Sequence, residues 1–422
     1  MGEAEVGAVG GLVDHLFRHS AGRMVAVLAR RLGADRLDLA EEVVQEALMQ
    51  ALTAWPYRGV PANPAGWLFQ VARHRALDRL RRDVVLRGKL ETLGAEWSET
   101  FGVATLRDVD DELAMMLMCC HPALPRPARV ALTLKTVGGF SVEEIAAAFL
   151  ARPATVAQRL VRAKRQIRAE RLSLEMPEAG ALPARLESVL DVLYLLFNEG
   201  YAAHGGDNLV RSELCGEAIR LARLVAGHPP TDRPPVHALL ALMLLQSSRL
   251  PARADAAGDV LLLAEQDRTR WDHALTAEGL HHLERSAAGE TVSVFHVEAA
   301  IAACHAAAPD EASTDWPYVL RLYDDLLALK PSPVVALNRA IALAMVDGPA
   351  AGIRALEALK RHRTLARYHL LPAALGALWR RAGAPATAAR YYRTALALPA
   401  SSPERRFLQR RLAECETAAA SS

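Results

Sequence analysis

A change from acidic to basic side chains within residues 38–83 is the most distinctive chemical feature of the chain. Residues 38–48 are rich in carboxylates, while residues 66–82 are rich in arginine and begin beside an aromatic side chain, Trp67. An acidic helix face on its own is most often solvated surface, whereas a local basic patch suits nucleic acid. The pattern therefore predicts recognition chemistry, with nucleic-acid binding by the second segment.

Two helices and a loop must position these groups. In residues 38–52 the apolar side chains recur at intervals of three and four, which leaves the acidic ones beside or opposite the apolar stripe. Pro56, Pro61 and Pro64 are incompatible with continued helix, so we expect a loop between Trp55 and Gly66. Helix resumes after this loop and carries the arginines.

A second nucleic-acid-binding candidate lies in residues 128–172. Ser141 and Glu144 have the spacing of a capping box, and Pro153 is a favoured first helical residue after a short turn. Two short helices joined by a tight turn, the second one basic, predict a helix-turn-helix. The side chains expected to pack inward are Val156, Leu160, Ala163 and Ile167. Those expected to face base edges and phosphates are Thr155, Gln158, Arg159, Arg162 and Arg165.

In this order the two blocks resemble regions 2 and 4 of the sigma-70 family of RNA polymerase initiation factors. The acidic residues 88–112 join them directly, which resembles the plan of the extracytoplasmic-function (group 4) members. Three positions depart from the residues common in that family. Ala151 stands where the turn usually has glycine, and Ala154 stands where glycine often precedes the Thr-Val pair. His74 stands where many members have asparagine.

The resemblance implies two partners, core RNA polymerase and promoter DNA, with contacts on the polymerase β′ clamp and β flap. The residues implied to dock on the clamp are Asp38, Glu41, Glu42, Gln45 and Glu46. Those implied to hold a flipped base and the non-template strand of the −10 element are Tyr57, Arg58, Asn63, Trp67, Arg73, His74, Arg75 and Arg79. The outward side chains of the helix-turn-helix are implied to read the −35 element.

Composition supports an all-α chain of several domains. The chain has 422 residues and a formal net charge of +2, so nucleic-acid binding must come from local basic patches. We expect region 2 at 8–87, an acidic linker at 88–112, region 4 at 113–173, a second linker at 174–186 and a helical extension at 187–416. Five cysteines without paired spacing indicate reduced thiols. With no signal peptide or long apolar span, we expect a cytoplasmic protein without membrane contact.

The extension carries a repeat near its end. Gly348-Pro349 recurs 35 residues later as Gly383-Ala384-Pro385, each time between Ala- and Leu-rich helical segments. This period resembles tetratricopeptide (TPR) helix pairs, which form concave surfaces for a protein or peptide partner. Four stretches, at 193–201, 265–272, 314–324 and 333–340, resemble a sigma subfamily with a large helical extension, often grouped as ECF42-like. That resemblance implies regulation through the extension.

Other polar clusters suggest alternatives. Cys119-Cys120-His121 resembles a metal-binding fragment but lacks a second ligand pair, so we expect buried thiols and no metal or cofactor. A hydrolase or metal site could use Glu199, Tyr201, His204 and Asp207, or Glu278 with His282. No nucleophile and base at a known spacing accompany them, so we expect helix caps and ion pairs, including Asp267, Arg268 and Asp272, and no enzyme.

The sequence therefore predicts a sigma factor that recruits core polymerase to a promoter and melts its −10 element. One alternative is a helix-turn-helix regulator with a ligand- or partner-sensing helical domain, which would bind duplex DNA without polymerase. A second is a TPR scaffold with vestigial DNA-binding modules, and the intact basic helices argue against it.

Overall fold

The computed structural model describes residues 20–85, 109–201, 211–255 and 258–420. Most of the predicted acidic linker lies outside these residues, as do His204 and Asp207. Within the described residues every regular element is a helix, apart from an isolated β-bridge between Ala254 and Val260. The all-α prediction is confirmed.

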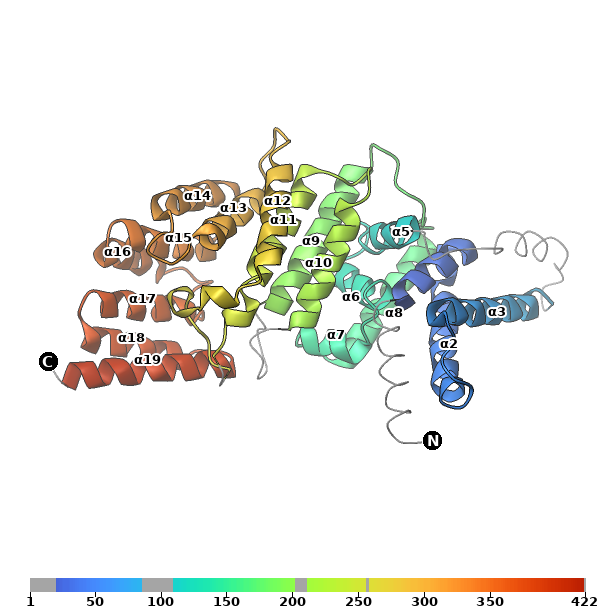
Figure 1. Ribbon diagram of the computed structural model, residues 1–422, viewed down its shortest axis with the longest axis horizontal. Helices are drawn as coiled ribbons and strands as arrows, with labels where there is room; N and C mark the ends of the chain where they lie inside the picture. Colours follow the sequence, from blue (N-terminus) through green and yellow to red (C-terminus); the bar gives the residue numbers. More distant parts are fainter. Residues whose placement is uncertain (1–19, 86–108, 202–210, 256–257, 421–422) are drawn as a thin grey trace. The chain divides into compact units, whose positions relative to one another are not determined.

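The chain divides into two compact units, unit 1 (Met1–Leu195) and unit 2 (Leu196–Ser422). The described part of unit 1 starts with a helical stretch over residues 20–32. The next helices of unit 1 are η1 (Ala34–Arg36), α2 (Leu37–Arg58), α3 (Pro64–Val85), α5 (Val109–Cys119), α6 (Arg126–Thr136), α7 (Val142–Ala148) and α8 (Pro153–Ala169). Helix α9 (Leu182–Tyr201) starts in unit 1 and ends in unit 2. Figure 1 shows α2 and α3 in blue and α5 to α8 in turquoise to green.

The loop between α2 and α3 is shorter than the sequence predicts. Helix α2 continues through Pro56 to Arg58, so the expectation that helix stops at Trp55 is wrong. Proline lacks the N–H that would bond one turn back, but the helix ends within the same turn, where losing one bond is tolerated. The amide of Gly59 still donates to the carbonyl of Trp55 over 3.0 Å.

Region 4 forms the predicted pair of helices. The capping box at the start of α7 is present, since Ser141 and Glu144 each accept from the other's backbone amide, over 3.0 Å and 2.8 Å. The turn that follows places Leu150, and not Ala151, in the left-handed region with φ of 48°. The amide of Ala151 bonds back to the carbonyl of Ala146 over 2.9 Å, as in a Schellman motif. A leucine therefore takes the backbone position that usually favours glycine.

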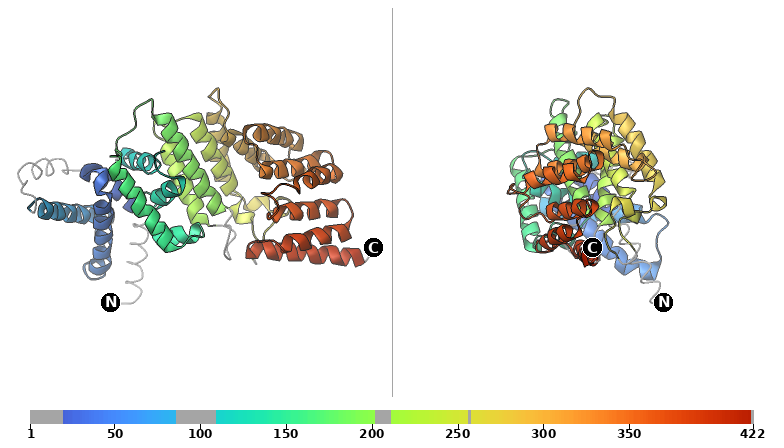
Figure 2. Two further views of the ribbon diagram at one scale, coloured as in Figure 1. Left: turned by 180° about the vertical axis from the view of Figure 1, so that it is seen from behind. Right: turned by 90° about the vertical axis from the view of Figure 1, so that its left-hand side faces the viewer.

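Unit 2 is a succession of antiparallel helices. They are α10 (Ser212–Ala226), α11 (Pro234–Ser247), η2 (Leu250–Ala252), η3 (Leu263–Glu265), η4 (Arg268–Arg270), α12 (His273–Ser286), α13 (Val294–Ala307), α14 (Trp316–Leu329), α15 (Pro333–Val346), α16 (Pro349–Leu359), α17 (Leu370–Arg381), α18 (Pro385–Leu396) and α19 (Ser402–Ala420). From α13 onward each helix packs on the next in sequence. Figures 1 and 2 show α17, α18 and α19 side by side.

The 35-residue repeat corresponds to two helical hairpins. Gly348 and Gly383 have φ of 84° and 75°, and each precedes the second helix of its hairpin, α16 or α18. The helices approach closely because small residues meet. A Cβ at Gly352 would lie 2.5 Å from the Cβ of Ala344, so no larger residue fits between α16 and α15 without a shift. Their relation to TPR proteins stays a prediction.

Helix α19 returns to a segment that lies about 150 residues earlier in the chain. Arg406 donates to Asp259 over 2.5 Å, and Arg411 donates to Glu265. Arg410 lies 3.6 Å from a carboxylate oxygen of Asp255. The last helix of unit 2 is thereby attached to the segment 255–265.

Candidate functional site

Helix α2 presents its acidic side chains on one face because its apolar residues occupy the other. The buried residues are Leu37, Ala40, Val43, Val44, Ala47, Leu48, Ala51 and Trp55. The five predicted docking residues are all exposed or half-buried; they are Asp38, Glu41, Glu42, Gln45 and Glu46. Asp38 lies in the first turn, where a carboxylate interacts favourably with the helix dipole. The structure thus gathers the predicted acidic face as a continuous surface of α2.

Two carboxylates of this face pair with arginines of α3. Arg79 donates to Glu42 over 2.7 Å and also to Glu46. Arg75 donates to Glu46 over 3.0 Å and to Gln50 over 3.0 Å. The hydrogen bond with Glu42, followed by the charges of both carboxylates, raises the pKa of Arg79 against an opposing effect of desolvation. The side chains predicted to bind polymerase and the −10 strand therefore neutralise one another.

The other carboxylates of the face are covered by helix α8. The ammonium group of Lys164 donates to Asp38 over 2.7 Å and to Glu41 over 2.8 Å. Arg168 donates to Asp38 over 3.0 Å, and the hydroxyl of Thr136 donates to Glu41 over 3.0 Å. We call these interactions the α2–α8 contact. Region 4 thereby engages two of the five side chains that region 2 is predicted to offer to polymerase, Asp38 and Glu41.

Lys164 and Glu41 form the least solvated pair of this contact, with each side chain only 12% exposed. Burial lowers the pKa of Lys164, but the charge of Glu41 and the hydrogen bonds to both carboxylates outweigh it, so the pKa is raised. Asp38 is 54% exposed, so its bonds with Lys164 and Arg168 are more strongly screened by water. The energetic centre of the contact is therefore the Lys164–Glu41 pair.

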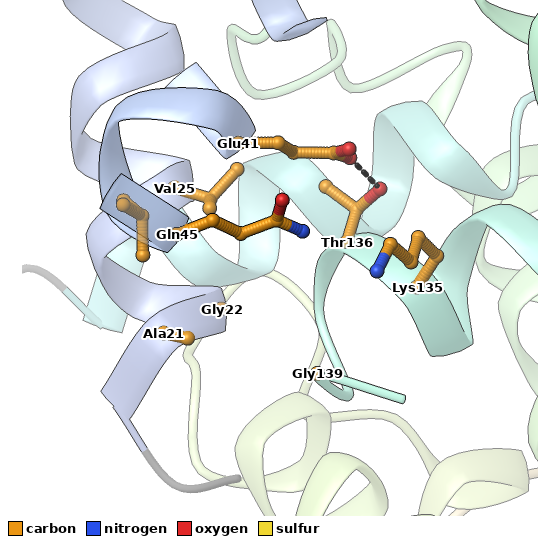
Figure 3. Close-up of a pocket in the computed structure, with 9 residues that line it drawn as sticks. Ala21, Gly22, Val25, Glu41, Gln45, Lys135, Thr136 and Gly139 are labelled. Carbon is orange, nitrogen blue, oxygen red and sulfur yellow. Dashed lines mark hydrogen bonds between the residues drawn. The ribbon is translucent and has the colours of Figure 1, made fainter. Parts of the chain in front are cut away.

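A small pocket lies beside the contact (Figure 3). Glu41 and Gln45 line it from α2, and Thr136 lines it from the end of α6. Gly22 lines it from the first helical stretch, and a Cβ there would lie 2.1 Å from the carbonyl oxygen of Val137. No side chain fits at position 22 unless the backbone moves, so this glycine permits the close packing of regions 2 and 4.

The residues predicted to bind the −10 element fall into three structural groups. Tyr57 and Arg58 are exposed at the end of α2, as is His74 on α3. Arg75 and Arg79 are paired with α2, as described above. The third group, Asn63, Trp67 and Arg73, makes contacts within the loop and helix α3 and, through Trp67, with α2.

Asn63 and Trp67 shape the start of α3. The side-chain oxygen of Asn63 accepts from the amide of Gly66 over 2.9 Å, which is the hydrogen bond of a helix N-cap. Trp67 is half-buried and meets the buried Trp55 edge to face, with ring centroids 5.4 Å apart. Both residues therefore help to stabilise the start of helix α3. Arg73 is also half-buried and donates to Gln70 over 3.2 Å.

The helix-turn-helix has the orientation that the sequence predicts. The residues expected to face inward, Val156, Leu160, Ala163 and Ile167, are the buried residues of α8. Of the five predicted −35 residues, Thr155, Gln158, Arg162 and Arg165 are exposed, and Arg159 is half-buried. Their side chains remain on the surface of unit 1, while Lys164 and Arg168 of the same helix are engaged with α2.

Sequence reasoning missed Lys164, Arg168 and Thr136. Lys164 lies one turn after Leu160 and next to Ala163, so it borders the buried stripe of α8. A lysine at such a border can lay its stem along apolar surface and reach a partner, which is the signal that could have identified it. Thr136 carried no comparable signal.

The thiols are buried as predicted. Cys119 and Cys120 are both 0% exposed, and burial raises the pKa of Cys120 to about 12. The imidazole of His121 is partly exposed and accepts from the amide of Ala123 over 3.0 Å. In the part of the chain that the structure describes, no group of three or more His, Cys, Asp or Glu side chains is arranged to hold a metal ion.

The polar motifs of unit 2 act mostly as caps and ion pairs. Glu199 pairs with Arg211, and Glu278 pairs with Arg223. Asp267 caps η4, and Asp272 caps α12 by accepting from two backbone amides.

Of the two roles predicted for these residues, helix cap and ion pair, Arg268 has the first. This guanidinium donates to the carbonyl of His305 over 2.6 Å and to that of Ala308. It therefore caps the end of α13, where unpaired carbonyls attract a cation.

Comparisons with known proteins identify three segments of the chain. Residues 16–84 match the family described as Sigma-70 region 2, and residues 114–167 match Sigma-70, region 4. Residues 185–287 match a family of unknown function, DUF6596. An uncharacterized protein of Rhizobium meliloti (strain 1021) is 38% identical over 384 residues, which cover 89% of this chain and 90% of that protein. No solved structure matches the chain.

Among the described helices, none is both long enough and apolar enough to cross a membrane.

Proposed function

Given that the chain carries regions 2 and 4 of the sigma-70 family of transcription initiation factors, we propose that it is a group 4 sigma factor whose helix α2 docks on the polymerase β′ clamp. The loop at 59–63 and helix α3 would engage the −10 element, and α8 would read the −35 element while region 4 binds the β flap. Members of this family are initiation factors and not enzymes.

The observation that carries this proposal is that the acidic face of α2 forms ion pairs with two other helices, α3 and α8. Asp38 and Glu41 pair with α8, while Glu42 and Glu46 pair with α3. A cationic clamp surface could replace Lys164 and Arg168, and DNA phosphates could replace the carboxylates around Arg75 and Arg79. Each exchange swaps one ion pair for another, so opening the contact on polymerase costs little electrostatic energy.

Run-off transcription with core RNA polymerase on a promoter library tests this proposal. We expect start sites with the wild type and at least a roughly tenfold loss with Glu42→Lys/Glu46→Lys, because each reversal repels the clamp. These reversals also free two arginines of α3, so Gln45→Lys is the cleaner variant. Gln45 is exposed, and a lysine there adds charge to the docking face without removing an ion pair. Glu187→Lys, on an exposed carboxylate of α9, is the matched control.

One observation favours a second candidate, a helix-turn-helix regulator independent of polymerase. Thr155, Gln158, Arg162 and Arg165 are exposed in the isolated chain, so α8 could meet duplex DNA directly. Tight, sequence-specific binding to promoter duplex without polymerase, together with no polymerase-dependent start sites, would establish that alternative.

We further propose that the extension is a TPR-like regulator of the sigma regions, as in the ECF42-like subfamily, which a truncation can test. Removal of everything after Leu172 would also remove the part of α9 that supports region 4, since Ser188 accepts from Arg129 and Arg185 donates to the carbonyl of Leu117 over 3.1 Å. A chain ending at Tyr201 keeps these bonds. We expect its transcription to differ from that of the full chain, and equal activity across growth conditions would argue against regulation.

A further inference from the structure

Three arginines of unit 2 gather where two of the sequence motifs meet. Arg249 and Arg253 flank η2, directly after α11, and Arg268 begins η4. Arg249 and Arg268 both lie over the ring of Trp271, at 5.5 Å and 4.7 Å from its centroid. Arg253 lies 3.9 Å from the ring centroid of Tyr201. We call these three residues the arginine cluster.

Backbone carbonyls hold two of these guanidinium groups in place. Arg253 donates to the carbonyl of Tyr201 over 2.5 Å, at the end of α9. Arg268 donates to two carbonyls at the end of α13, as described above. Arg249 has only a long contact, 3.5 Å, from its Nε to the side-chain oxygen of Gln266. Each guanidinium group thus uses some of its N–H groups in contacts with the protein, while its other N–H groups make none.

The cluster lacks the carboxylates that accompany other arginines of unit 2. In residues 211–255 and 258–420, no ion pair to an acid is formed by Arg249, Arg253 or Arg268. Asp310 and Glu311 act on Arg268 electrostatically, but from beyond ion-pair distance. Among the described residues, no carboxylate therefore lies within ion-pair distance of these three positive charges.

Buried N–H groups around the cluster also lack partners. Trp271 is only 4% exposed, and its indole Nε1 has no hydrogen-bond acceptor. The Nη2 atom of Arg268 is likewise a buried donor without a partner. A buried donor without an acceptor is costly, so this arrangement favours an acceptor supplied from outside the chain.

The electrostatic surroundings of the cluster also favour a bound anion. Burial, with an added contribution from Arg253, lowers the pKa of Arg249. Burial and the charges of Arg249 and Arg268 lower the pKa of His305 to about 4, so this imidazole is neutral at pH 7. An anion at the cluster would offset the repulsion among the cations.

We propose that the arginine cluster binds a small oxyanion, either a phosphate group or a multiply charged carboxylate. Guanidinium forks match both geometrically, and the indole N–H of Trp271 adds a neutral donor. The ligand would join η2, η4 and the ends of α9 and α13, and so connect the motifs at 193–201 and 265–272. This role goes beyond promoter recognition, because it gives the extension a chemical input of its own.

Binding to the full-length protein tests the proposal. Inorganic phosphate and citrate are titrated by calorimetry at constant ionic strength in chloride, which separates the two oxyanion classes. We expect one of them to bind, and Arg249→Met to weaken it roughly tenfold or more, because a charged hydrogen-bond donor is lost. Arg253→Lys keeps the charge but loses the fork and should weaken binding several-fold.

Two controls localise the effect. Arg223→Met, in the same unit but paired with Glu278, and Arg162→Met, on the DNA-facing helix, should both leave the affinity unchanged. Hydrogen exchange should show protection by the bound oxyanion in residues 249–271. Equal affinity in Arg249→Met, no protection there, or no binding of either anion above the chloride background would each overturn the proposal.

Discussion

Lys164 in unit 1 and Arg249 in unit 2 are both cations withdrawn from water, but their surroundings differ. Lys164 has two carboxylate partners within 2.8 Å, whereas Arg249 has other arginines and aromatic rings beside it. A buried charge with its partner maintains a contact, and removal of either member is costly. A buried charge without a partner lowers the stability of the fold, unless a bound ligand of opposite charge compensates it. The same physical chemistry thus distinguishes a contact within the chain from a candidate binding site.

The largest effect is expected for Lys164→Met. Glu41 would keep only the hydroxyl of Thr136 while its side chain remains largely buried, so we expect a loss of about 3 kcal/mol in the free energy of unfolding. Urea denaturation of the full chain measures it. Arg81→Met is the matched control, because Arg81 and Asp78 are 68% and 60% exposed and their pair is worth at most about 0.5 kcal/mol. Equal losses of unfolding free energy in Lys164→Met and Arg81→Met would show that the buried pair is worth no more than the exposed one.

Glu404 shows how a paired carboxylate behaves in unit 2. Burial raises its pKa, but the nearby His369 and the hydrogen bonds from Ser401 outweigh this and lower the pKa to about 2. A folded-state pKa below the unfolded value stabilises the fold above pH 4.5, and that stability is lost as the pH falls toward 2.

We therefore expect Glu404→Gln to lower the neutral-pH stability by about 2 kcal/mol, allowing for solvent screening, and to flatten acid unfolding between pH 4.5 and 2. Circular dichroism across that range measures both. An unchanged acid limb would show that Glu404 is not the responsible group.

A smaller loss is expected for Arg223→Met. Arg223 binds Glu278 through two hydrogen bonds of 2.7 Å and 2.6 Å, but the side chains are 45% and 33% exposed. Solvent screening limits such a pair to about 1 kcal/mol, which thermal unfolding can measure. A loss as large as that of Lys164→Met would mean that exposure does not separate these pairs.

The smallest effect is expected for Arg249→Met in a buffer free of phosphate and citrate. The variant keeps the apolar stem and removes a charge without a partner, so stability should stay within about 0.5 kcal/mol or rise. Urea denaturation beside wild type measures the difference. A loss near that of Lys164→Met would make the cluster a structural element and contradict the comparison.

Local patterns were enough to predict much of this molecule. The buried stripe of α8 and the capping box of α7 follow from spacing alone, because both depend on residues within one or two turns. The hairpins around Gly348 and Gly383 were also visible as a repeat. Pro56 was interpreted too strictly, because a proline in the last turn of a helix sacrifices only one hydrogen bond.

Contacts between distant segments could not be predicted in the same way. Lys164 lies 123 residues from Glu41, and nothing in either local pattern selects the other as its partner. Arg268 was expected to form an ion pair or a cap, because composition cannot distinguish a carboxylate from the backbone carbonyls at the end of α13. The partners of Lys164 and Arg268 both depend on how distant helices pack, and the residues near each position in the sequence do not reveal that packing.

The attachment of α19 to residues 255–265 has a consequence for how unit 2 can change in evolution. Open helical-repeat arrays lengthen or shorten by duplication or loss of a helix pair, since each pair contacts only its neighbours. Here Arg406, Arg410 and Arg411 connect the last helix to Asp255, Asp259 and Glu265. An added or deleted hairpin would displace α19 and break these ion pairs. These ion pairs therefore constrain the number of helical hairpins between residue 265 and α19, while the sequence of each hairpin can still diverge.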